Sequence, residues 1–207
     1  MTELLPMPPT ALSERLLILA STSPYRRVLL ERLKLPFAIE APEVDETPTP
    51  GETPRTLAAR LAEAKARAVA NRHAGSPGLV IGSDQVADRD GEPLGKPGDI
   101  DTAAAQLASL SGRSLLLHSG LCVVDCLSGR SRTIVDSHEV RFRHLDHAAI
   151  DRYLKVEQPL DAAGSFYSEG FGVVLFESFH GRDPNSIVGL PLMALVDLLG
   201  EFGLRLP

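Results

Sequence analysis

The stretch LLILASTSPYRRVLLERL, residues 16–33, decides the class of fold, because a strand, a tight turn and a helix follow one another in it. Its unbroken apolar beginning predicts a buried strand over 16–21. Ser23 is a candidate helix N-cap, and Pro24 stands at the first helical position, where its missing N–H costs nothing. Apolar residues then recur at helical spacing up to Leu33.

The rest of the chain repeats these two kinds of element. Caps, apolar periodicity and breakers predict further strands at 37–41 and 79–84, a hairpin over 115–145 that bends at 128–129, and a Gly-rich loop that enters a strand over 163–178. Thr53-Pro54 repeats the cap and the proline before a long Ala-rich helix that runs to residue 73. The same signals predict helices at 101–110, 146–156 and 191–203, and turns at 88–95 and 181–191. We therefore expect an α/β fold with a mixed sheet and helices packed around it.

Length and composition fit one globular domain over residues 1–207, with 1–14 as a flexible extension. The net charge of -6 argues against a protein that coats nucleic acid. No basic segment precedes an apolar run at the N-terminus, and the run at 16–20 is too short to span a bilayer. We therefore expect a cytoplasmic protein that has no membrane as a partner. Cys122 and Cys126 are expected to be buried structural thiols.

The turn at 21–27 is the first candidate site. Ser21, Arg26 and Arg27 surround a predicted helix N-terminus, where free N–H groups and the helix dipole favour an anion. Arginines there are unfavourable unless an anion is present, and their forked donors suit phosphate oxygens. An ordinary N-cap with solvated arginines is the alternative.

Acidic residues supply the next candidates. Asp84 ends a predicted buried strand, where α/β folds place ligands; it is a metal ligand or a general base, or else the start of an Asx-turn that ends the strand. Glu46 in a loop and Lys65 on the following helix are a weaker pair, which could equally be a polar loop and a surface lysine. Glu169 lies in the Gly-rich loop, where a plain turn with one exposed acid is the alternative.

Lys96 follows a glycine, but the segment is not a P-loop. Only three residues separate Gly91 from Gly95, and Pro97 replaces the Ser or Thr that would hold magnesium. Lys96 can still contact a phosphate as a point charge. The six histidines show no metal-binding pattern, so carboxylates and substrate phosphates would hold any metal, which suits Mg²⁺ or Mn²⁺.

Eight blocks in order resemble the Maf family of nucleotide pyrophosphatases, from about Leu16 to the last helix. They are LILASTSPYRRVLLERL, APEVDET, LAEAKA, IGSDQV, LGKP, LSGR, AGSFYSEGFG and GRDPNSIVGLPL. The resemblance implies a mixed, twisted α/β sheet with flanking helices, in two lobes around a cleft, similar to inosine triphosphate pyrophosphatases.

The resemblance also implies roles. Asp84 would activate water, or bind the metal that does, and Glu46 would be a second carboxylate at the metal. The triphosphate would be held by Ser21, Arg26, Arg27, Lys65 and Lys96. Such a site fits phosphoryl transfer, in which catalysis is mostly positioning and charge neutralisation.

Tyr25, Gln85 and Glu169 depart from the commonest Maf pattern and match the subgroup that resembles 7-methyl-GTP pyrophosphatases. A glutamate can accept both donors of the guanine edge, whereas a glutamine suits thymine or uracil. Methylation at N7 makes the base cationic, which favours the face of Tyr25, and a buried Glu169 would complement that charge. Tyr25 could also be only an aromatic at a helix start.

The sequence therefore predicts a hydrolase acting on acid anhydrides, which cuts 7-methyl-GTP to 7-methyl-GMP and diphosphate with a divalent metal, as house-cleaning of modified nucleotides. One alternative is a dTTP and UTP pyrophosphatase of the same family. Another is a non-catalytic nucleotide-binding regulator of septum formation. We expect a small-molecule nucleotide substrate and no nucleic-acid partner; the sequence leaves a homodimer open.

Overall fold

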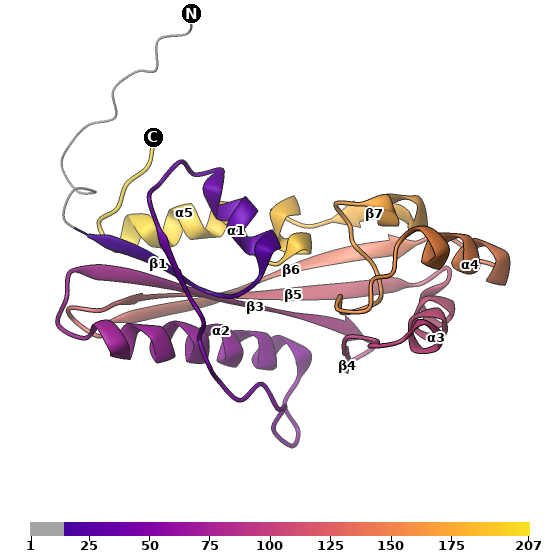
Figure 1. Cartoon of the computed structure of the whole chain (residues 1–207), viewed down its shortest axis with the longest axis horizontal. Helices are drawn as coiled ribbons and strands as arrows, with labels where there is room; N and C mark the ends of the chain where they lie inside the picture. Colours follow the sequence, from indigo (N-terminus) through magenta and orange to yellow (C-terminus); the bar gives the residue numbers. More distant parts are fainter. Residues whose placement is uncertain (1–14) are drawn as a thin grey trace, which may run out of the picture.

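The computed structural model describes residues 15–207, which form one mixed α/β unit (Figure 1). The predicted extension over 1–14 lies outside the described residues. The α-helices are α1 (Pro24–Glu31), α2 (Pro54–Ala70), α3 (Ile100–Leu110), α4 (His147–Val156) and α5 (Leu192–Glu201). The strands are β1 (Leu16–Ala20), β2 (Ala38–Glu40), β3 (Gly78–Arg89), β4 (Glu92–Leu94), β5 (Ser114–Asp125), β6 (Ser131–Phe142) and β7 (Phe176–His180). Short 3₁₀ helices are η1 (Asn71–His73), η2 (Phe171–Leu175) and η3 (Pro184–Val188).

The helices α1 and α2 begin where the sequence predicts. Ser23 Oγ accepts a hydrogen bond from the backbone N–H of Arg26, and Thr53 Oγ1 accepts one from the N–H of Thr56. A proline follows each cap at the first helical position. Since these side chains satisfy donors that the helix leaves open, they fix the first turn of α1 beside the end of β1.

The sheet has seven strands in the order β2-β1-β3-β5-β6-β7, with β4 paired to β3 off this path. β1 runs parallel to β2 and β3, whereas β5 is antiparallel to both of its neighbours, β3 and β6. The strands β3, β5 and β6 have 12 residues each. The mixed sheet and the hairpin are thus confirmed. The predicted strand over 79–84 is too short, because pairing with β5 carries β3 through a polar sequence to Arg89.

One side of β3 has a gap in its pairing. The parallel register with β1 ends at Ala20 opposite Gly82, and the antiparallel register with β4 begins at Leu94 opposite Ala87. Among the described residues, no strand pairs with Ser83–Val86 on this side; we call these four residues the β3 gap. Asp84 therefore lies within a strand, and the alternative of an Asx-turn that ends the strand is wrong.

The helices pack on the sheet in separate groups, and the protein has two lobes with a core each. Figure 1 shows α2 along one face of the sheet and α1 and α5 on the other, with α3 and α4 near the far end of the long strands. One core packs α1 and α5 on the sheet, for example through Leu30 and Leu195. A second core joins α3 and α4 to the other end, for example through Leu107 and Tyr153. β3, β5 and β6 run through both lobes, which confirms the predicted architecture.

Two glycines let α2 lie directly on the sheet. A Cβ atom at Gly82 would overlap the backbone of Ala62 and Ala66, and one at Gly120 would overlap the carbonyl of Ala58. Because neither glycine carries a side chain, the backbone of α2 approaches β3 and β5 closely. This contact fixes the distance between β3 and the neighbouring residues of α2.

Both cysteines are free thiols and buried, as predicted. Burial raises the pKa of the Cys122 thiol to about 11, so this side chain stays protonated and unreactive near neutral pH. Within residues 15–207, no helix is both long and apolar enough to cross a membrane.

Candidate active site

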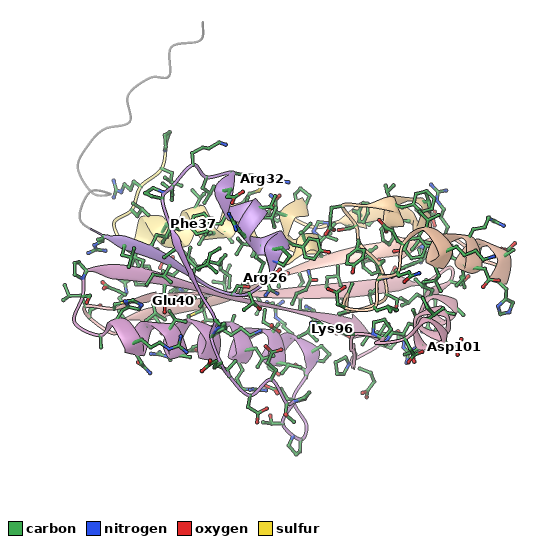
Figure 2. All side chains as sticks on the ribbon, viewed as in Figure 1. Arg26, Arg32, Phe37, Glu40, Lys96 and Asp101 are labelled. Atoms are coloured by element: carbon green, nitrogen blue, oxygen red, sulfur yellow. The ribbon has the colours of Figure 1, made fainter. Side chains whose placement is uncertain are left out.

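A cavity of about 940 Å³ opens at the β3 gap, between the two lobes. Its walls come from the β1–α1 turn, the loop after β2, α2, the β3 gap, β4, the loop before η2, and η3. Figure 2 shows Arg26 near the middle of the molecule and Lys96 on the side of β4. The lining residues that the sequence singles out are Ser21, Tyr25, Arg26, Glu46, Lys65, Asp84, Gln85, Lys96 and Glu169.

Lys65 joins two carboxylates at the floor of the cavity. Its Nζ lies 2.6 Å from Asp84 Oδ1 and 2.7 Å from Glu46 Oε1. Lys65 and Asp84 are buried, whereas the Glu46 side chain is 60% exposed and reaches in from the rim. The alternative of a surface lysine is therefore wrong for Lys65. Buried charges of this kind persist where they are paired or serve a site.

The loop that carries Glu46 is tied to α2 by Arg60. The Arg60 guanidinium donates to both carboxylate oxygens of Glu52, at 2.7 and 2.9 Å, and to the carbonyl of Thr47. The hydrogen bonds that Glu52 accepts from Arg60, with one from the N–H of Thr49, lower the pKa of Glu52 to about 2. The loop next to Glu46 is thus held from the same helix that carries Lys65.

Arg26 reaches the cavity from the first turn of α1. Its Nε donates to the carbonyl of Gly189 at 2.9 Å, and the buried Ser83 hydroxyl donates to the same carbonyl at 2.8 Å. Burial lowers the pKa of the Arg26 guanidinium, and the negative charges of Asp84 and Glu46 oppose this shift. An anionic ligand in the cavity would join Asp84 and Glu46 as a third negative group and would give the buried Arg26 guanidinium a further partner.

Ser21 and Lys96 stand on opposite sides of the cavity. Ser21 is buried, and its hydroxyl accepts a hydrogen bond from the N–H of Ser23 at 3.1 Å, so it shapes the turn into α1. Lys96 follows β4 and is exposed at the rim. Their predicted role in holding phosphates stays a prediction.

Arg27 lies elsewhere. Its Nε pairs with Glu31 Oε1 at 2.9 Å, both side chains are exposed, and the residue lines a separate surface pocket with Leu35 and Phe37. Successive helix residues point in directions about 100° apart, and on α1 this rotation leaves Tyr25 and Arg26 at the cavity but turns Arg27 to the other pocket. The structure does not bring Arg27 together with the other candidates.

Gln85 lines the cavity, but its side-chain amino group is hydrogen-bonded to η3. Nε2 donates to the carbonyls of Ser186 and Ile187 at 2.6 and 2.9 Å and lies 3.3 Å from Ser119 Oγ. Only the amide oxygen is left for a ligand. Gln85 therefore shapes the η3 wall, and any direct contact with a substrate uses it as an acceptor.

The base-recognition candidates Tyr25 and Glu169 line the cavity together with Tyr167. Tyr25 and Tyr167 have ring centroids 5.8 Å apart at an interplanar angle of 32°. Glu169 is exposed, which corrects the expectation of a buried acid. Among the described residues, the hydroxyl of Ser168 donates a hydrogen bond to the Glu169 carboxylate at 3.1 Å.

Sequence reasoning missed Gln106 on α3, which links two walls of the cavity. Its Nε2 donates to the carbonyl of Gly95 at 3.1 Å, and its Oε1 accepts from the hydroxyl of Ser165 at 2.6 Å. Ser165 is buried with a positive φ of 65°, an uncommon backbone state for a residue other than glycine. A single polar residue on a helix gives no signal of such a link.

The carboxylates fit a divalent cation that substrate phosphates would share. Asp84 and Glu46 both lie within hydrogen-bond distance of one ammonium group, so their charges converge on one point. Within residues 15–207, no three His, Cys, Asp or Glu side chains are grouped as a metal site. Mg²⁺ is commonly bound by one or two carboxylates together with phosphates rather than by a complete protein cage.

Known proteins resemble the chain over nearly all its length. Residues 16–202 match the family model described as "Maf-like protein". A protein of Alcanivorax borkumensis named "7-methyl-GTP pyrophosphatase" is 49% identical over 92% of this chain and 96% of its own. One of Bordetella pertussis with the same name is 54% identical over 91% and 92%. The Staphylococcus aureus Ham1 protein shares the fold, with a TM-score of 0.50 and 14% identity over 91% of this chain and 97% of its own.

Proposed function

The chain belongs to the Maf-like protein family, and from this premise we propose that its cavity hydrolyses 7-methyl-GTP to 7-methyl-GMP and diphosphate. The observation that carries the proposal is the Asp84–Lys65–Glu46 group on the floor of a cavity that also presents Arg26 and Lys96. The names of the relatives support the choice of base and of reaction.

The triphosphate binds between the two lobes. Arg26 and the N-terminus of α1 face it from one side, and Lys96 faces it from the other. Lys65, at the floor of the cavity, neutralises negative charge of the phosphates. Since the protein as a whole is acidic, these side chains supply the local positive charge that a polyphosphate requires.

Asp84 is the proton acceptor in the proposed step. A water oxygen attacks the α-phosphorus, the bond from that phosphorus to the oxygen that bridges the α- and β-phosphates breaks, and diphosphate leaves. The proton of the water passes to Asp84, whose second oxygen is not used by Lys65. Lys65 orients the carboxylate towards the cavity. A Mg²⁺ or Mn²⁺ ion held by Glu46 and Asp84 would neutralise charge on the phosphate oxygens.

The base occupies the end of the cavity lined by Tyr25 and Glu169. The Glu169 carboxylate accepts hydrogen bonds from N1–H and the 2-amino group of guanine, which an exposed side chain at the rim is free to reach. Tyr25 presents its ring to the cationic methylated base. The proposal locates the enzyme in the cytoplasm, where nucleoside triphosphates are made and used.

Pyrophosphate release from a panel of triphosphates tests the proposal. Purified protein with Mg²⁺ or Mn²⁺ should hydrolyse 7-methyl-GTP with a higher kcat/KM than GTP, dTTP or UTP. Hydrolysis of dTTP or UTP at least as fast as that of 7-methyl-GTP would instead favour a pyrimidine-specific pyrophosphatase. Binding of nucleotides without any pyrophosphate release would favour a non-catalytic regulator.

A further inference from the structure

The segment over 157–175 makes the base end of the cavity, which Tyr25 and Glu169 line, acidic. This segment contains no lysine or arginine, and it carries three acids, Glu157, Asp161 and Glu169. Asp161 and Glu169 line the cavity, together with Tyr167 between them. The cations that line the cavity, Arg26, Lys65 and Lys96, come from other elements.

Asp161 is bonded to the aromatic pair. The Tyr167 hydroxyl donates a hydrogen bond to Asp161 Oδ1, and the Tyr167 ring lies 5.8 Å from that of Tyr25, centroid to centroid. Burial raises the pKa of the Tyr167 hydroxyl, and the bond to Asp161 raises it further. Tyr167 therefore stays a neutral donor, and the negative charge of the pair rests on Asp161.

Two hydrogen bonds that backbone N–H groups of this segment donate, one to α4 and one to its C-cap residue Glu157, fix its position. Tyr153, which is almost fully buried, accepts a hydrogen bond from the N–H of Tyr167 at 3.4 Å. Glu157 Oε1 accepts one from the N–H of Phe171 at 2.7 Å. The loop that carries Tyr167 is thus anchored before and after Glu169, so its charges keep their place at the base end.

We infer that Asp161 and Tyr167 are specificity-determining residues that select a cationic purine base over its neutral counterpart. The inference rests on the proposed function and deepens it. A cation over the face of a tyrosine gains from the ring quadrupole, and a carboxylate bonded to that tyrosine adds attraction that a neutral base does not feel. 7-Methylguanine carries the positive charge, whereas guanine has the same edge without it.

The test compares 7-methyl-GTP with GTP, which share the triphosphate and the edge read by Glu169. It uses the full chain at slightly acidic pH, where the methylated base keeps its charge. In Asp161→Asn, the ratio of kcat/KM for 7-methyl-GTP to that for GTP should fall about tenfold, mainly through KM, because the amide keeps the hydrogen bond but loses the charge. The kcat/KM for GTP should stay nearly unchanged.

Asp151→Asn is the matched control, since Asp151 is an exposed acid on α4 and does not line the cavity; its ratio should equal that of the unaltered protein. Tyr167→Phe keeps the ring but releases Asp161, and it should lower the ratio by a smaller factor. It also serves as the test if Asp161→Asn does not fold. An unchanged ratio in Asp161→Asn, or in Tyr167→Phe if only that variant folds, would overturn the inference. Failure of the unaltered protein to prefer 7-methyl-GTP would instead overturn the proposed function.

Discussion

Asp84 and Lys65 form a buried ion pair, and each makes the burial of the other tolerable. Lys65 Nζ lies 2.6 Å from Asp84 Oδ1, with both side chains about nine-tenths buried. Removing one charge of such a pair leaves the other without compensation, whereas removing both costs less. The pair is therefore coupled in stability as well as in the proposed reaction.

This coupling predicts a non-additive result. Lys65→Met should lower the free energy of unfolding by about 3 kcal/mol, because Asp84 is left charged and unpaired in a buried place. The double variant Lys65→Met/Asp84→Asn should recover most of that loss. Urea unfolding of the single and double variants measures the coupling. Strictly additive effects would mean that the two side chains do not interact as the structure shows.

Glu169 predicts a change of substrate. Glu169→Gln replaces one acceptor oxygen with a donor, which suits the edge of thymine or uracil better than that of guanine. The ratio of kcat/KM for dTTP to that for 7-methyl-GTP should rise by about tenfold or more. Steady-state kinetics with both substrates checks it, with Glu177→Gln, an exposed acid on β7 outside the cavity, as the control. If the ratio stayed constant, Glu169 would not read the base.

The sequence singled out Asp84 and Lys65, and regular backbone geometry explains why they lie together, whereas their roles stay predictions. Asp84 faces α2 because strand residues alternate, and Lys65 meets it because α2 packs at Gly82. The sequence could not choose between Arg26 and Arg27, since that depends on the rotation of α1 about its axis. The exposure of Glu169 depends on how α4 anchors a loop, and no local pattern encodes that.

At the scale of elements, α2 and β3 act as one unit. Gly82 and Gly120 allow the backbone of α2 to rest on the sheet, and α2 then delivers Lys65 to the β3 gap. The length of β3 was underestimated because its second half is polar and is held by β5 rather than by an apolar pattern. The gap itself follows from where β1 ends and β4 begins, which only the pairing register reveals.

Gly82→Ala tests this unit. A Cβ atom there would overlap the backbone of α2, so the variant should lose about 2 kcal/mol of stability or more and should displace Lys65. A fall in melting temperature together with a fall in kcat is expected. Gly200→Ala is the control, because a Cβ at Gly200 meets no atom within 4 Å, and its helix should be neutral or slightly stabilised. Equal effects of the two substitutions would contradict the role given to Gly82.

At the scale of the molecule, the two lobes share β3, β5 and β6 and so cannot separate without breaking the sheet. The cavity lies where the lobes diverge on one side of β3. The two lobes and the mixed sheet were predictable from the order of elements and motifs, whereas the course of the strands through both lobes was not. A homodimer stays a prediction.

Shared strands predict a single unfolding transition. The chain has no tryptophan and three tyrosines, of which Tyr153 and Tyr167 lie in the second lobe. Near-ultraviolet circular dichroism of tyrosine therefore reports mainly that lobe, and the far-ultraviolet signal reports the whole chain. The two melting curves should coincide. Separate midpoints would show that the lobes unfold independently.

The central claim is that the cavity at the β3 gap cuts a nucleoside triphosphate with Asp84 as the group that takes the proton. The most direct measurement is turnover of 7-methyl-GTP by Asp84→Asn, with nucleotide binding by calorimetry on the same sample, beside Asp90→Asn, an exposed acid in the β3–β4 turn. The account predicts that kcat falls by a factor of about 10³ in Asp84→Asn while the nucleotide still binds, and that Asp90→Asn behaves like the unaltered protein. Turnover by Asp84→Asn within a few-fold of the unaltered protein would contradict it.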